Sequence, residues 1–191
     1  MNKVKKFIIN NKAKLIFCII LAIAIFTRLY KIDTIPHGIN VDEAGMAYDA
    51  YCLANYGTDR YLNHNPVYLI NFGGGQSAMY AYIASAFIKI FGFSIITIRF
   101  PAFFLGIIAI VLSYFMVKDK LGEKFALGFM LLITICPWHI MSSRWGLDCN
   151  LLAPMSIISM FFLLKAKNTK GYIIAGIFIG LTLYTYALSY I

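Results

Sequence analysis

Acidic residues are scarce in this sequence, and charged residues of either sign make up little of it. Of the 191 residues, 8 are Asp or Glu and 13% are charged, whereas 61% are hydrophobic. Soluble domains carry about 25% charged residues. With a mean hydropathy of +0.76, the composition excludes an ordinary soluble domain and indicates an integral membrane protein.

The sequence also lacks a motif for metal binding by cysteine or histidine. Its 4 cysteines show no metal-ligand spacing, and His37, His64 and His139 lie far apart along the chain. There is no low-complexity segment and no clear internal repeat. A divalent metal ion would therefore have to use carboxylates.

Positive charge is present in excess, but its distribution argues against a nucleic-acid partner. The net charge is +9, and the lysines sit in short clusters between apolar runs. Such clusters are typical of cytoplasmic loops in membrane proteins. We therefore expect a multi-pass protein of the cell membrane with a cytoplasmic N-terminus.

Apolar runs predict an all-α fold, a polytopic membrane helix bundle that forms one module over residues 1–191. Residues 31–94 contain most of the acids and the glycine and proline punctuation, so they are expected to form a long loop outside the membrane. Two helices are predicted inside this loop, over residues 41–56 and 77–91. The predicted membrane-spanning helices cover about 13–30, 95–117, 125–142, 151–164 and 172–190.

The segment 77–91 decides the topology of everything that follows. It is shorter than the roughly 20 residues that a spanning helix needs, so we expect it to lie along the membrane surface. The lysine-rich turn at 118–124 then falls in the cytoplasm, as the positive-inside rule prefers. If 77–91 spanned instead, that turn would lie outside.

One short stretch of the outer loop carries two adjacent carboxylates, Asp42 and Glu43. Asn40 is a good N-cap residue, and Glu43 then falls at the third helical position, which resembles a capping box. Gly57 is a plausible helix stop. The pair is open to three interpretations: a general base, a metal ligand or only a cap.

The predicted topology places Asp148 on the same outer face as Asp42 and Glu43. Arg144 belongs to the same short outer loop, at 143–150. Acids and an arginine around an outer cavity suit polar chemistry beside lipid. The alternative is that these acids are merely solvated in wet loops, since loop charges usually are, and topology alone leaves the two readings even.

Several short motifs occur in order along the chain and form a family pattern. They are Arg28-Leu29-Tyr30, Asp42-Glu43, Arg99-Phe100-Pro101, Pro137, Arg144 and Asp148. This pattern resembles the N-terminal part of GT-C fold membrane glycosyltransferases. The nearest branch contains the protein O-mannosyltransferases and the aminoarabinose transferases of lipid A, and the resemblance covers essentially all of the chain.

The resemblance implies an activity and a role for each acid. Such enzymes transfer a sugar from a polyprenyl-phosphate carrier to a hydroxyl of a lipid, glycan or protein acceptor outside the cytoplasm. The catalytic base falls on Asp42, with Glu43 beside it, and the acid that helps the acceptor or metal site falls on Asp148. Some relatives bind a divalent metal ion, here through Asp42 and Asp148, and others need none.

Arg144, and less strongly Arg99, are candidates for binding the phosphate that leaves, since positive groups stabilise it. Structural or interfacial arginines are the commoner alternative. The loops that hold the carrier phosphate in relatives usually lie further along the chain, and we expect this sequence to be the N-terminal part of a longer protein or a truncated one.

Two other functions compete with the enzyme. One is a non-enzymatic membrane protein, such as part of a transporter or an assembly subunit; the other is an inactive truncated glycosyltransferase. A transporter should place ionisable residues near the bilayer midplane. Here the carboxylates lie in the predicted loops instead, which favours chemistry at the membrane surface.

Overall fold

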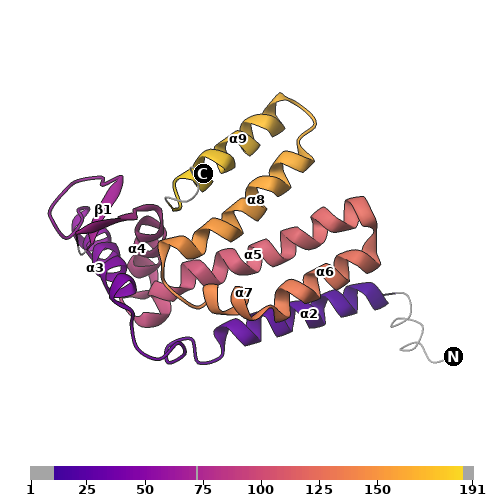
Figure 1. Cartoon of the computed structure of the whole chain (residues 1–191), viewed down its shortest axis with the longest axis horizontal. Helices are drawn as coiled ribbons and strands as arrows, with labels where there is room; N and C mark the ends of the chain where they lie inside the picture. Colours follow the sequence, from indigo (N-terminus) through magenta and orange to yellow (C-terminus); the bar gives the residue numbers. More distant parts are fainter. Residues whose placement is uncertain (1–10, 72, 187–191) are drawn as a thin grey trace.

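The protein is an α-helical bundle with one small β-hairpin (Figure 1). The computed structural model describes residues 11–71 and 73–186. Its elements, in chain order, are α2 (Lys12–Leu29), α3 (Val41–Tyr56), β1 (Tyr68–Asn71), β2 (Gly74–Ser77), α4 (Met79–Phe91), α5 (Ile95–Leu121), α6 (Glu123–Ile135), α7 (Pro137–Ser142), the 3-10 turn η1 (Asp148–Leu151), α8 (Leu152–Lys165) and α9 (Thr169–Leu183). The expected all-α class is confirmed, apart from the hairpin.

Two helical stretches of the described residues are long and apolar enough to cross a membrane. They are α5, with 27 residues, and the stretch Asp148–Lys165, with 18 residues. Both agree with spans expected from the sequence. The helices α2, α6 with α7, and α9 lie where the other spans were expected, and their crossing of the membrane stays a prediction.

The helix predicted over 125–142 is interrupted. It consists of α6 and α7, with Cys136 between them in an extended conformation at φ −63° and ψ 117°. Pro137 explains the break, because proline lacks an N–H and disfavours helical geometry at the preceding residue. Pro137 then starts α7, a position that proline tolerates well.

The last helix also differs from its predicted range of 172–190. The structure has α9 from Thr169 to Leu183, and the residues up to 186 are not helical. Asn168 sets the earlier start, because its side chain accepts a hydrogen bond from the backbone N–H of Gly171 at 2.9 Å. The end of the predicted range, 187–190, lies outside the described residues.

The hairpin was not predicted; its residues were read as irregular loop. Its strands pair antiparallel, with Tyr68 opposite Ser77 and Asn71 opposite Gly74. Gly75 lets the ring of Tyr68 lie directly against the backbone, since a Cβ at Gly75 would overlap that ring. Glycines are rare in strands, so the glycine run at 73–75 did not predict a strand.

The helix α3 has the predicted bounds and the predicted caps. The side chain of Asn40 accepts a hydrogen bond from the N–H of Asp42 at 2.9 Å, and Gly57 ends the helix with a left-handed φ of 72°. The capping box is not completed by Glu43, whose carboxylate bonds elsewhere. Caps are local signals, which is why this helix was the easiest to predict.

The helices α3 and α4 and the hairpin gather at one end of the long helices (Figure 1). Buried side chains from α3, β1, α4, α5, η1 and α8 form one core there, including Met46, Tyr80 and Leu151. The buried side of α4 consists of Tyr80, Ala81, Ala84 and Ile88. Ile90 and Phe91, at its end, are exposed, and the placement of α4 along the membrane surface stays a prediction.

Candidate active site

Asp42 and Asp148 line the same pocket, which we call the acid pocket. Its volume is about 340 Å³, and its walls come from the start of α3, the hairpin and the segment before α8. The lining residues are Asp42, Asn71, Gly74, Gly75, Gln76, Leu147, Asp148, Cys149 and Tyr186. Pockets that bind small molecules measure roughly 300–1,000 Å³, so the space suits a sugar-sized ligand.

Asp42 is the exposed carboxylate of the pair. It lies in the first turn of α3, where the helix dipole and the free N–H groups favour an ionised carboxylate. The side-chain amide of Asn71 donates to its Oδ1 at 3.1 Å. Within the described part of the chain, no group donates to Oδ2, which leaves one oxygen to accept a proton or a hydrogen bond.

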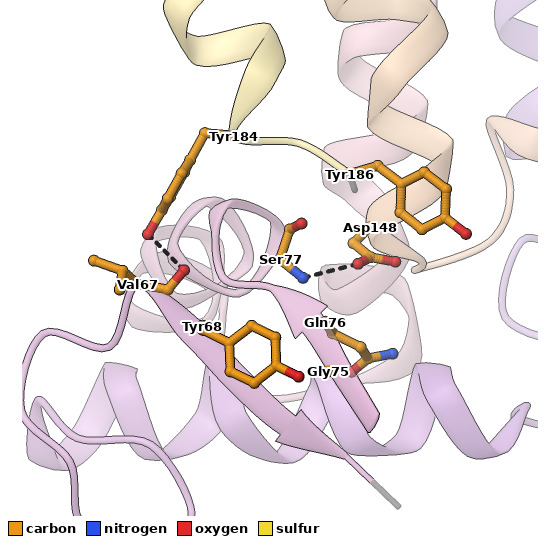
Figure 2. Close-up of a pocket in the computed structure, with 8 residues that line it drawn as sticks. All are labelled: Val67, Tyr68, Gly75, Gln76, Ser77, Asp148, Tyr184 and Tyr186. Atoms are coloured by element: carbon orange, nitrogen blue, oxygen red, sulfur yellow. Dashed lines mark hydrogen bonds between the residues drawn. The ribbon is translucent and has the colours of Figure 1, made fainter. Parts of the chain in front are cut away.

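Asp148 is buried, at 6% exposure. Its Oδ2 accepts the backbone N–H of Ser77 at 2.9 Å, and its Oδ1 accepts the backbone N–H of Cys149 at 2.8 Å. The first of these bonds joins the start of η1 to the end of β2, as Figure 2 shows. Asp148 therefore fixes the hairpin against the helix bundle as well as lining the acid pocket.

A second, smaller pocket continues from the acid pocket and is rich in tyrosine (Figure 2). It measures about 190 Å³, and it shares Gly75, Gln76, Asp148 and Tyr186 with its neighbour. Its other walls include Val67, Tyr68, Ser77 and Tyr184. The hydroxyl of Tyr184 donates to the carbonyl of Val67 at 2.8 Å, which ties the end of α9 to the hairpin.

Glu43 does not line the acid pocket; it forms a buried ion pair with Arg99. The guanidinium donates from Nε to Oε1 at 2.7 Å and from Nη2 to Oε2 at 2.9 Å. A third hydrogen bond to this carboxylate comes from the backbone N–H of Gly146, which donates to Oε1 at 2.9 Å. Glu43 is 1% exposed and Arg99 is 0% exposed. Both carboxylate oxygens are thus engaged, with Arg99 of α5 and, through Oε1, with the loop before α8.

Arg99 and Arg144 both hold the chain between α2 and α3. The remaining donors of Arg99 reach the backbone carbonyls of Ile32, Pro36 and Gly38. Arg144 donates to the carbonyls of Thr27, Arg28, Tyr30, Lys31 and Ile35. Burial lowers the pKa of Arg144, and the charge of Arg99 acts in the same direction. Neither arginine lines the acid pocket.

The acid pocket holds no ready-made cluster of metal ligands. Among residues 11–71 and 73–186, no group of three or more His, Cys, Asp or Glu side chains could hold a metal ion. Both oxygens of Asp148 accept backbone N–H groups, which leaves each a further lone pair. A metal ion here would need Asp42, Asp148 and the unpartnered Oε1 of Gln76, with water completing its coordination shell.

Sequence reasoning missed two amides of the acid pocket, Asn71 and Gln76. They flank the glycine run, and the pairing of β1 with β2 turns both toward Asp42. The side chain of Gln76 donates to the backbone carbonyl of Asp42 at 3.2 Å, while Asn71 donates to its carboxylate. The one signal available was the placement of two amides beside glycines in the acid-bearing loop.

These features define a helical membrane protein with a polar pocket that holds a pair of carboxylates at one end of its bundle. A sequence model of the family described as dolichyl-phosphate-mannose-protein mannosyltransferase matches residues 76–191. The match covers more than half of the chain, and the chain belongs to this family of mannosyltransferase-type glycosyltransferases. No curated protein matches the chain, and no solved structure does.

Proposed function

We propose that this chain carries the acceptor-activating site of a glycosyltransferase that uses a polyprenyl-phosphate sugar. The sugar passes to a hydroxyl of a lipid, glycan or protein acceptor on the extracytoplasmic side of the membrane. One observation carries the proposal: Asp42 and Asp148 line one pocket in a member of a mannosyltransferase family.

In the proposed reaction Asp42 is the general base. Its carboxylate takes the proton of the acceptor hydroxyl while the hydroxyl oxygen forms a bond to the anomeric carbon of the sugar. The bond from that carbon to the carrier phosphate breaks, and the phosphate leaves with the electron pair. A phosphate needs no general acid to depart, so one base suffices, unlike the carboxylate pair of glycosidases.

The arrangement of charge supports the extracytoplasmic placement. The turns α5–α6 and α8–α9 lie at the end of the bundle away from α3 and the hairpin (Figure 1). An ion pair between Lys165 and Asp119 joins the ends of α8 and α5 that lead into these two turns, and Lys14 lies beside Lys118 and Glu123 in one surface groove. Lysines thus gather opposite the acid pocket, as expected when that pocket faces outside.

The test is the substitution Asp42→Asn in the full-length protein. Asn keeps the size and the first-turn position but removes the basicity, so transfer should fall by roughly 10²–10⁴-fold, the range that general-base catalysis contributes. The measurement is the rate of mannose transfer from a labelled polyprenyl-phosphate mannose in membrane vesicles that contain the native acceptors.

Asp33→Asn is the matched control, because Asp33 is an exposed acid of the same outer segment that does not line the acid pocket. It should leave transfer unchanged. An Asp42→Asn enzyme that transfers at the parent rate would overturn the assignment of the base. Loss of transfer in Glu43→Gln alone would report on the buried pair with Arg99 and not on the base, because Glu43 does not line the acid pocket.

A further inference from the structure

A chain of hydrogen bonds runs from the buried side of α3 to the candidate base. It begins at Asp49, one of the innermost side chains of that helix, at 1% exposure. Arg60 donates to Asp49 from Nε at 3.0 Å, from Nη2 at 2.7 Å and from its backbone N–H at 3.0 Å. This bidentate pair fixes the plane of the guanidinium. The hydrogen bond with Asp49 raises the pKa of Arg60, while burial acts against it.

The fixed guanidinium in turn orients the amide of Asn71. Its Nη1 donates to Oδ1 of Asn71 at 3.3 Å, and Nδ2 of the same amide donates to Oδ1 of Asp42 at 3.1 Å. Turning the amide over would place its NH₂ against the guanidinium and its oxygen against the carboxylate. Because both contacts would then be repulsive, one orientation of Asn71 is selected.

A glycine makes this arrangement possible. Gly45 lies in α3 directly under the two polar side chains, and a Cβ at that position would stand 2.4 Å from Oδ1 of Asn71 and 2.8 Å from Nη2 of Arg60. Glycine inside a helix is unfavourable by itself. Its presence here lets Asn71 and Arg60 approach the helix closely enough to reach Asp42 and Asp49.

We infer that Asn71 is a positioning residue, held by Arg60 and Asp49, that orients the carboxylate of Asp42 for proton abstraction. This rests on the proposed role of Asp42. By occupying Oδ1, Asn71 limits rotation of an otherwise exposed carboxylate and leaves Oδ2 to meet the acceptor hydroxyl. A base held in the reactive orientation avoids the loss of rate that a freely rotating group incurs.

The test is Asn71→Asp in the full-length protein, assayed as above. Asp keeps the acceptor for Arg60 but faces Asp42 with an oxygen instead of an N–H. We expect kcat to fall roughly tenfold to a hundredfold, since a hydrogen bond to the Asp42 carboxylate is lost and a second negative charge is brought against it. KM for the polyprenyl-phosphate mannose should stay unchanged, because Asn71 acts through Asp42. The control Asn55→Asp makes the same change on the exposed side of α3 and should be silent.

A double-mutant cycle separates positioning from a general structural role. In an Asp42→Asn background, Asn71→Asp should change kcat by no more than about twofold, because the carboxylate that Asn71 orients is already absent. An undiminished loss in that background, or a raised KM, would mean that Asn71 serves the fold or binds substrate itself, and would overturn the inference. Unchanged kcat in Asn71→Asp alone would overturn it as well.

Gly45→Ala provides a second variant that leaves Asn71 in place. Its methyl group should displace the amide and lower kcat in the same way, with the same absence of effect in the Asp42→Asn background. A Gly45→Ala enzyme with parent kcat would contradict the inference. Full activity of Asp42→Asn is a different outcome, because it would remove the proposed function itself.

Discussion

At the scale of single residues, two buried arginines supply hydrogen-bond donors that an irregular segment lacks. Residues 30–40 connect α2 to α3 without regular structure, so most of their carbonyl groups lack the backbone donors that a helix provides. Arg99 and Arg144 supply the missing donors. Buried carbonyls without donors are costly. Both arginines belong to the motifs singled out in the sequence, and in this structure they shape the loop that leads into Asp42.

The ion pair of Glu43 with Arg99 should be the most sensitive contact of this kind. Glu43→Gln leaves the guanidinium buried at 0% exposure without a counter-charge, which should destabilise the protein by about 3 kcal/mol. Thermal or denaturant unfolding in detergent measures the change. Lys118→Gln is the control: its pair with Glu123 is 42% and 44% exposed, so its loss should leave the free energy of unfolding nearly unchanged. Equal effects of the two variants would refute this account.

Some residues of the acid pocket could be predicted from the sequence, and others depend on contacts between distant parts of the chain. Asp42 and Asp148 could be predicted because charge is rare in this sequence and topology brings both to one face. Asn71 could not, because its role depends on the pairing of β1 with β2 and on the guanidinium of Arg60. Arg99 and Arg144 were predicted as candidates for binding the phosphate, with a structural role as the alternative, and the sequence could not show that carbonyls and Glu43 take up their donors.

At the scale of elements, local signals were read correctly and long-range ones were missed. The capping residues Asn40 and Gly57 predicted both ends of α3. The interruption at Cys136 follows from Pro137 and could have been predicted from that proline alone. The hairpin depends on contacts that no local pattern announces, since Asp148 accepts the N–H of Ser77 across 71 positions of sequence. Its weak strand residues are held by tertiary contacts rather than by propensity.

The cap of α3 gives a prediction at this scale. Asn40→Ala removes the acceptor of the Asp42 N–H and should destabilise the protein by roughly 1 kcal/mol. Transfer should fall much less than in Asp42→Asn, because the carboxylate keeps its bond from Asn71. Unfolding measurements and the transfer assay on one preparation compare the two effects. A loss of transfer as large as that of Asp42→Asn would show that the cap itself places the base.

At the scale of the whole molecule, the two ends of the bundle differ in chemistry. One end holds α3, the hairpin and the acid pocket, and the other holds the lysine-bearing turns (Figure 1). A bilayer between them would put lysines inside and acids outside. On α4, Ile90 and Phe91 are 72% and 67% exposed, which suits the prediction that this helix rests on the outer surface.

This orientation predicts which positions a membrane-impermeant maleimide can reach in intact cells. The background is a variant without the native cysteines, Cys18, Cys52, Cys136 and Cys149. Tyr61→Cys, at a position 55% exposed in the acid-bearing loop, should react from outside. Lys120→Cys, in the last turn of α5, should react only after permeabilisation, because lysine-rich segments are retained in the cytoplasm. Labelling of Lys120→Cys in intact cells, with Tyr61→Cys protected, would show that the protein has the opposite orientation in the membrane. The acid pocket would then face the cytoplasm, and acceptor activation outside the membrane would be ruled out.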